Sequence, residues 1–205
     1  MIAVVITISL LKLRRHMHGF HQGCPVLDDI IPRYNPDVIL LQKHWLIPAN
    51  LCKFDVHFPD YFSFGSLSMT SCVEAGMLRG RPFGNVITLI NNTLRKITET
   101  VCCSDRYVIV KIADCLLVNV YLPCDGTINV NLICDDVLAD IYAWRQRYNK
   151  CQIVVAGDFN VNLDVSDSVS RAVSHFIDDC SLLRCDDLFP GEKVPTLCHI
   201  MLILL

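Results

Sequence analysis

The stretch QIVVAGDFNVNL at residues 152–163 joins an apolar run directly to polar side chains. Such an unbroken run is typical of a strand buried on both faces of a sheet. The end of the strand holds Asp158 and Asn160 at the rim of that sheet. An aspartate there can accept a proton from an attacking water, and an asparagine amide can donate to a phosphoryl oxygen. The pattern fits phosphodiester cleavage, and equally a plain Asp/Asn turn that leaves a strand.

A second apolar strand, LLVNVYLPC at residues 116–124, contains Asn119 and Tyr121 near its end. A tyrosine at a strand end can hydrogen-bond a phosphate. It can also be an interior tyrosine satisfied by a backbone carbonyl, and this segment alone favours that interpretation.

Hydrophobic patterning predicts an α/β protein with two mixed sheets facing one another and helices outside. Strands are expected at residues 3–11, 37–41, 61–64, 85–90, 107–112, 115–121 and 151–156. Helices are expected at residues 25–34, 130–148 and 168–179, with Asp167 capping the last. Residues 83–121 suggest hairpin-like neighbours, and residues 76–84 suggest a surface loop.

Length and composition fit a single globular domain over residues 1–205, because the apolar share is 52% and the mean hydropathy is +0.39. The net charge of −3 excludes a broad basic field that would hold nucleic acid by phosphate neutralisation alone. A cleaving enzyme needs only a local phosphate site and can borrow positive charge from a metal ion, so a nuclease remains compatible.

The cysteine pattern and the apolar N-terminal run bear on the protein's cellular location. The 12 cysteines include no C-x-x-C pair, which argues against zinc and favours reduced thiols without disulfides. The apolar run before Lys12 is too short to span a bilayer and lacks preceding basic residues, so neither a membrane helix nor a signal peptide is expected. We expect an intracellular monomer, cytoplasmic or nuclear.

The order of NVYLP, a long amphipathic helix and GDFN resembles the endonuclease/exonuclease/phosphatase superfamily. Four further segments resemble the endonuclease domains of non-LTR (LINE-type) retrotransposons: NPDVILLQKHWL at 35–46, FPDYFSFG at 58–65, GRPFGNVITLI at 80–90 and CSLLRCDDL at 180–188. The resemblance covers about residues 13–197. It implies a four-layered, deoxyribonuclease I-like α/β sandwich that binds Mg²⁺ or Mn²⁺ at the mouth of the sheets and hydrolyses DNA.

Carried over by position, the resemblance implies active-site roles for Asp158, Asn160, Tyr121 and Asn119. Asp158 would also touch the metal, and Asn160 the substrate. The family's main Mg²⁺ ligand, a glutamate, falls on Lys43, whose ammonium has no lone pair for a hard cation. We therefore expect weakened metal binding. His16 falls on an expected asparagine and could contact a phosphate, although a histidine among other histidines and arginines is more often a surface residue.

The family's closing strand, with a serine and an Asp-His pair, has no counterpart after Thr196, where the sequence reads LCHIMLILL. We expect a C-terminally truncated copy that lacks its last strand. Residues 200–205 should pack on the sheet edge left open or project without stable contacts.

Three functions remain open. The first is a Mg²⁺-dependent DNA endonuclease domain whose activity is impaired. The second is an inactive remnant that binds nucleic acid or protein, and the third is a phosphatase of the same superfamily. If the resemblance holds, Lys43, Tyr121, Asp158 and Asn160 should converge at one rim of the sheets.

Overall fold

The computed structural model describes residues 19–67, 75–76, 85–184 and, for the backbone, 201–203. The expected strand at 3–11, His16 and most of the expected loop at 76–84 lie outside the described residues. None of the helices in the described part is long and apolar enough to cross a membrane. The cysteines within it are all free thiols.

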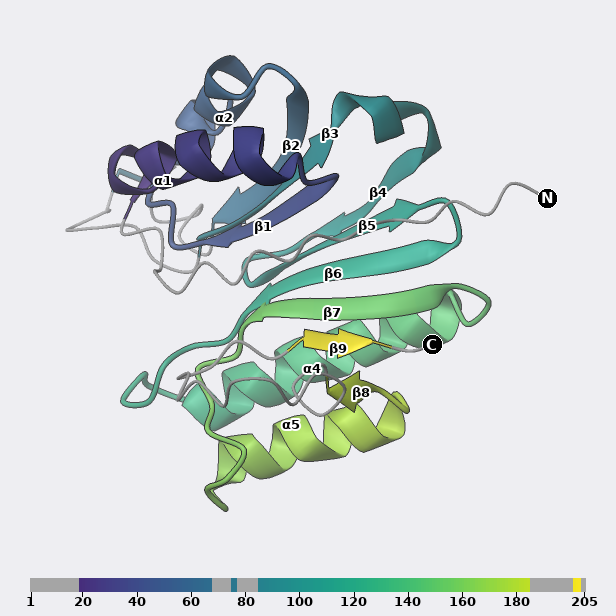
Figure 1. The fold of residues 1–205 in the computed structure, drawn as a ribbon. Coiled ribbons are helices and arrows are strands. Elements are labelled where there is room, and N and C mark those ends of the chain that lie inside the picture. The colour runs from purple at the N-terminus through teal and green to yellow at the C-terminus, as the bar shows by residue number, and fades with distance from the viewer. Residues whose placement is uncertain (1–18, 68–74, 77–84, 185–200, 204–205) are drawn as a thin grey trace.

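One sheet has three strands in the order β1-β3-β2, paired antiparallel. The strands are β1 (Val38–Gln42), β2 (Tyr61–Leu67) and β3 (Asn85–Asn91). Helices α1 (Phe20–Tyr34) and α2 (Lys53–His57) cover its outer face, with a short 3₁₀ turn at Pro48–Asn50 (Figure 1). Leu27 and Phe54, both fully buried, pack these helices against the sheet.

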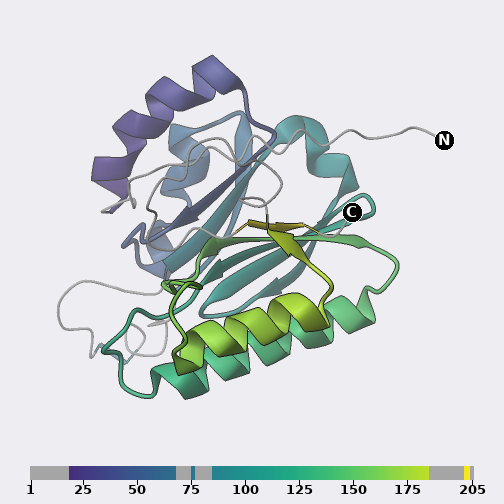
Figure 2. The ribbon, with the colours of Figure 1, turned by 60° about the horizontal axis from the view of Figure 1, so that its bottom comes forward.

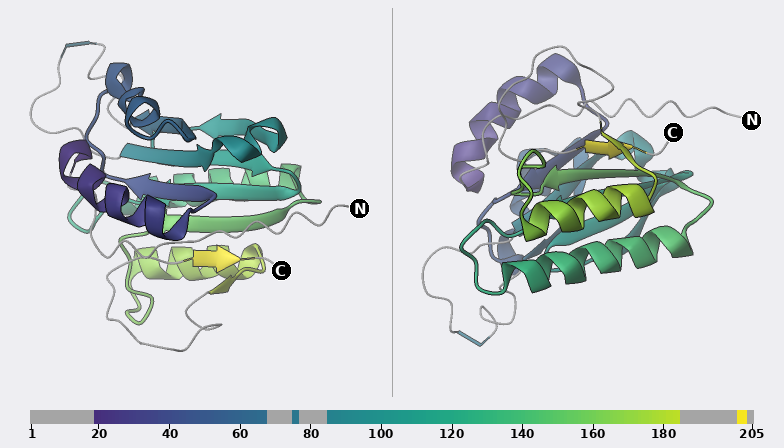
Figure 3. Two further views of the ribbon diagram at one scale, coloured as in Figure 1. Left: turned by 45° about the horizontal axis from the view of Figure 1, so that its top comes forward. Right: turned by 90° about the horizontal axis from the view of Figure 1, so that it is seen from below.

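The second sheet has six strands in the order β4-β5-β6-β7-β9-β8. They are β4 (Thr98–Cys103), β5 (Tyr107–Ile112), β6 (Cys115–Tyr121), β7 (Gln152–Asp158), β8 (Leu183–Arg184) and β9 (Met201–Ile203). Among the strand pairs that the structure describes in this sheet, only β6–β7 is parallel. Helices α4 (Val130–Arg147) and α5 (Ser168–Asp179) lie side by side on its outer face (Figure 2, Figure 3).

The two sheets face one another, so the chain forms the expected four-layered α/β sandwich (Figure 1). Apolar side chains fill the space between them, among them Val38, Phe62, Val86 and Ile90 from one sheet and Val108, Val110, Ile112 and Leu117 from the other. Each sheet is thus buried on both faces, which explains the unbroken apolar runs in the sequence.

Two of the differences between the sequence predictions and the structure have a clear physical reason. Helix α1 begins at Phe20 rather than at residue 25, because the Phe20 N–H bonds to the carbonyl of His44, 2.8 Å away. Strand β4 was not predicted, since this edge strand has only half-buried and exposed residues and lacks a continuous apolar run. The expected cap of α5 is present: Asp167 accepts a hydrogen bond from the Ser170 N–H at 2.8 Å.

The backbone of residues 201–203 follows the first of the two outcomes expected for the C-terminal tail. Strand β9 pairs antiparallel with residues 154–156 of β7 and, on its other side, with β8. Residues 201–203 of the tail therefore take part in the sheet instead of projecting from it.

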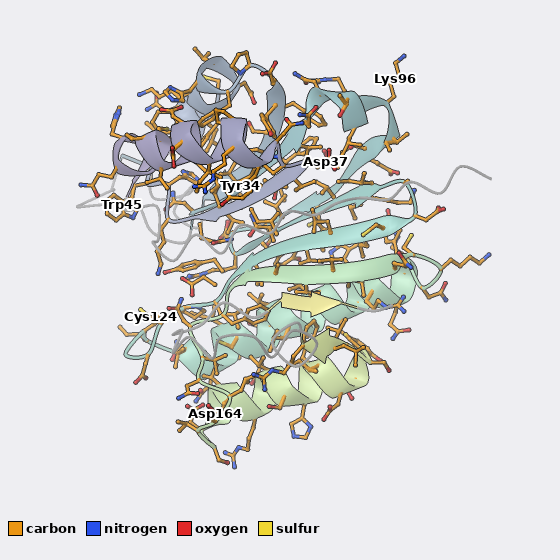
Figure 4. The ribbon with its side chains drawn as sticks, viewed as in Figure 1. Tyr34, Asp37, Trp45, Lys96, Cys124 and Asp164 are labelled. Atoms are coloured by element: carbon orange, nitrogen blue, oxygen red, sulfur yellow. The ribbon has the colours of Figure 1, made fainter. Side chains whose placement is uncertain are left out.

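Strands β1, β6 and β7 end at the same end of the sandwich. Figure 4 shows this for β1 and β6 by its labelled side chains: Trp45, which follows β1, and Cys124, which follows β6, lie at one end, and Asp37 and Lys96 at the other. Strand β7 runs parallel to β6 and ends beside it, because Tyr121 pairs with Asp158. Residues that follow these strands in sequence are therefore gathered at one rim.

The loop after β1 is fixed by local hydrogen bonds. The Lys43 N–H donates to the Asn85 carbonyl at 2.8 Å, and the Lys43 carbonyl accepts from the Gly19 N–H at 3.1 Å. Nδ1 of His44 accepts from the Leu46 N–H at 3.1 Å. His44 is fully buried, and this desolvation lowers the pKa of its ring from 6.5 to about 4.

We expect His44 to make stability fall in mild acid. Above pH 6.5 the ring is neutral in both states; between 6.5 and about 4 only the unfolded chain takes up the proton. The free energy of unfolding should then drop by about 1.4 kcal/mol per pH unit. Urea titrations across this range measure the slope, which should shrink in His44→Asn and persist in His175→Asn, a change on the exposed face of α5. An unchanged slope in His44→Asn would contradict the assignment.

Gly157 lets β6 and β7 approach closely just before Asp158. Its φ is +149°, and a Cβ there would lie 1.9 Å from the Val120 carbonyl oxygen. Only glycine fits without moving the backbone of one strand.

Gly157→Ala should therefore destabilise the fold by about 3 kcal/mol or more, since both strain and a backbone clash oppose it. Gly126→Ala is the matched control, because Gly126 also has a positive φ but a Cβ there meets nothing within 4 Å. The control should cost about 1 kcal/mol. Equal losses for the two variants in urea unfolding would show that the close approach is unimportant.

Candidate functional site

Lys43, Tyr121, Asp158 and Asn160 meet at the rim where β1, β6 and β7 end. Lys43 Nζ lies 2.8 Å from Asp158 Oδ2 and 5.2 Å from the centroid of the Tyr121 ring. Tyr121 and Asp158 are paired neighbours in the β6–β7 register. Asn160 joins them through its backbone N–H, which donates to Asp158 Oδ1 at 3.3 Å. The structure thus gathers the four residues expected to converge.

Asp158 is the most buried charged group of this cluster, with no exposed side-chain surface. A carboxylate removed from water needs a counter-charge and hydrogen bonds. Lys43 supplies the charge and the Asn160 N–H a hydrogen bond. The Lys43 side chain keeps 20% of its surface exposed, so the ion pair is reachable from solvent on the lysine side only.

The backbone that carries these groups is strained. Lys43 has a φ of +62° and Asn160 a φ of +47°, both in the left-handed region. This conformation costs a lysine about 1–2 kcal/mol, whereas asparagine adopts it more readily. Strained residues of this kind cluster at functional sites, where the surrounding structure holds them in place.

Tyr121 lies at the inner side of the rim and is buried. Burial, and then the negative charge of Asp158, raise the pKa of its phenol to about 12, so it is a neutral hydrogen-bond donor at physiological pH. The guanidinium carbon of Arg106 lies 5.6 Å from the ring centroid, and the Arg106 carbonyl accepts from the Tyr121 N–H at 2.8 Å. The ring is therefore contacted by two cations, Lys43 and Arg106.

Sequence reasoning missed Arg106. It stands in a turn before β5, in the segment SDRY, where a single arginine looks like any solvated turn residue. Only the pairing of β5 with β6 brings it to Tyr121, since Tyr107 pairs with Val120. Its burial lowers the pKa of the guanidinium from its ordinary value.

Asn119 is completely buried between the two sheets. Its Oδ1 accepts from Gln42 Nε2 at 2.6 Å, and its Nδ2 donates to the Ile87 carbonyl at 3.0 Å and to Thr88 Oγ1 at 3.2 Å. These bonds tie β6 to β1 and β3, which favours a positioning role over contact with a substrate. Gln42, the partner that precedes Lys43, was not anticipated.

The side chain of Asn160 is also engaged. Its Nδ2 donates to the Leu122 carbonyl at 2.8 Å, which fastens the turn after β7 to the end of β6. An amide carries two N–H donors, so this bond uses one of them. His16, the other candidate for substrate contact, lies outside the described residues.

The donor set at the rim does not fit Mg²⁺. Magnesium needs oxygen ligands in near-octahedral geometry, and the carboxylate available here, that of Asp158, has the Lys43 ammonium 2.8 Å from Oδ2. Within the described part of the chain, no three or more His, Cys, Asp or Glu side chains are grouped so that they could hold a metal ion. A cation at Asp158 would have to displace Lys43.

Comparison with known proteins places the fold. No family model matches the sequence. The comparison with curated proteins also gave no match. Among solved structures, an AP endonuclease from Archaeoglobus fulgidus aligns with a TM-score of 0.64 at 14% identity, over 92% of this chain and 84% of that one.

Two further solved structures agree. A 3′ phosphatase, NExo, from Neisseria, bound to a product DNA hairpin, has a TM-score of 0.64 at 10% identity, over 92% of this chain and 84% of that one. An endonuclease/exonuclease/phosphatase family protein from Bacteroides thetaiotaomicron has a TM-score of 0.59 at 12% identity, over 90% and 75%. The chain therefore has the deoxyribonuclease I-like fold of endonuclease/exonuclease/phosphatase proteins.

Proposed function

We propose that this chain is a DNA-binding domain of the retrotransposon endonuclease type in which Mg²⁺-dependent phosphodiester hydrolysis is impaired or lost. The observation that carries the proposal is the ion pair between Lys43 and Asp158, 2.8 Å apart at the rim. The proposal also rests on the fold, on the residues gathered at the rim and on the sequence motifs that contain these residues.

The ion pair works against hydrolysis in two ways. Asp158 can serve as a base only if its oxygen is free to take a proton from water, and Lys43 holds Oδ2. An ammonium also carries one charge rather than two and cannot acidify a bound water as a metal ion does. Both effects act on the chemical step.

Phosphate binding is less affected than hydrolysis. The rim keeps the Lys43 ammonium, the Tyr121 phenol and the Asn160 amide, all of which can donate to phosphate oxygens. One of the structurally similar proteins was solved with a DNA hairpin, which supports DNA as the ligand proposed here.

A phosphatase is the second candidate, because a 3′ phosphatase is as similar in fold as the AP endonuclease. Phosphate-monoester hydrolysis would be hindered by the same ion pair between Lys43 and Asp158. The nuclease-type proposal is preferred because FPDYFSFG and GRPFGN resemble the retrotransposon domains.

We expect the purified chain not to nick supercoiled plasmid in Mg²⁺ or Mn²⁺ above the background without metal. Lys43→Glu should gain Mg²⁺ binding that calorimetry detects, since it returns a carboxylate to the site. Asp158→Ala serves as the control. Metal-dependent nicking by the unmodified chain that disappears in Asp158→Ala would overturn the proposal.

A double-mutant cycle should show that the ion pair supports the fold. Lys43→Met keeps the side-chain length and the backbone strain but leaves Asp158 charged and buried, so it should cost about 3 kcal/mol of unfolding free energy. Combining it with Asp158→Asn should cost less than the sum of the two single changes by about 1–3 kcal/mol. Urea unfolding gives all four values, and strict additivity would mean that the pair contributes nothing.

A further inference from the structure

We infer that Lys43 replaces a divalent cation in this site and lets the chain engage the DNA phosphodiester backbone without metal. The inference rests on the proposed DNA binding and goes beyond it by assigning the ligand contact and its independence from metal.

The first support is the counter-charge of Asp158. The carboxylate is fully buried, and a covalently attached ammonium lies 2.8 Å from it. The anion is therefore already neutralised within the fold. A metal ion that approached the same oxygen would meet a positive charge at close range, and like charges at such a distance repel strongly in a partly dry site.

The second support is the placement of that ammonium. Lys43 keeps a fifth of its surface exposed, while Asp158 beneath it has none, so an incoming ligand meets the cation rather than the anion. The Lys43 ammonium carries three N–H donors, and its nitrogen lies at ion-pair distance from Asp158 Oδ2. A phosphate oxygen is the acceptor for which a compact point charge of this kind is suited.

The third support is the charge balance around Tyr121. Lys43 and Arg106 both contact its ring, at 5.2 and 5.6 Å from the centroid, and the phenol stays neutral at physiological pH. Among the residues that the structure describes, Lys43 and Arg106 bring positive charge to the ring and Asp158 brings negative charge; the carboxylate of Asp105, next to Arg106, is exposed and screened by water. An anionic phosphodiester is the kind of ligand that two cations beside a neutral phenol favour.

The test measures fluorescence anisotropy of a labelled DNA hairpin in EDTA and in Mg²⁺ at matched ionic strength. The unmodified chain should bind equally in both buffers, within about twofold, because its cation is built in. Lys43→Gln should bind about tenfold more weakly in both, since one charge-assisted contact is lost. The slope of log affinity against log salt should also fall by about one.

Lys43→Glu should bind weakly in EDTA and recover in Mg²⁺, which converts the site to metal dependence. Lys150→Glu is the matched control: Lys150 is exposed and precedes β7, at the end opposite Asp158, so the same change in charge there should leave affinity within about twofold. Circular dichroism confirms that each variant is folded.

Tenfold tighter binding by the unmodified chain in Mg²⁺ would overturn the inference and leave the proposed DNA binding standing. So would Lys43→Gln binding as tightly as the unmodified chain. Absence of hairpin binding by the unmodified chain in both buffers would overturn the inference and the proposed function together.

Discussion

A carboxylate that folding removes from water must be balanced by positive charge and hydrogen bonds or lose its own charge. Asp158 stands at the end of β7, which pairs parallel with β6, and its surroundings meet that demand from two directions. Lys43 follows β1 of the other sheet and contributes the positive charge. Asn160 lies in the turn after β7 and contributes a hydrogen bond from its N–H. The rim is organised around this buried carboxylate, and its chemistry follows from the nature of the counter-charge.

The need to satisfy buried polar groups also couples the two sheets. Asn119 and Gln42 hydrogen-bond to each other across the interior. Asn119 lies two residues before Tyr121 on β6, and Gln42 directly precedes Lys43. Because these amides are buried, breaking their bonds would leave unsatisfied polar groups in an apolar layer. They therefore fix the distance over which Lys43 reaches Asp158. His44, the fully buried residue that follows Lys43, holds the same loop through its hydrogen bond from the Leu46 N–H.

The sequence allowed the layered fold and most of the rim to be predicted, for identifiable reasons. Strands β6 and β7 are buried on both faces, so their apolar runs are unbroken and end abruptly at Tyr121 and Asp158. The cap at Asp167 could be predicted because it depends only on residues close together in the sequence, Asp167 and Ser170. Arg106 and Gln42 were missed because their significance depends on strand pairing and on the facing of two sheets, which no short segment encodes. The start of α1 was misplaced because a tertiary hydrogen bond to the loop after β1 extends the helix.

The central claim is that Lys43, and no metal ion, balances Asp158. Anomalous diffraction from crystals soaked in Mn²⁺ tests it most directly, because Mn²⁺ accepts the oxygen ligands that Mg²⁺ does and its position is read from its own scattering. The account predicts no anomalous peak at Asp158, with Lys43 Nζ still within ion-pair distance of Oδ2 as found here, at 2.8 Å. A peak at metal-ligand distance from the Asp158 carboxylate, with the Lys43 side chain turned away, would contradict it.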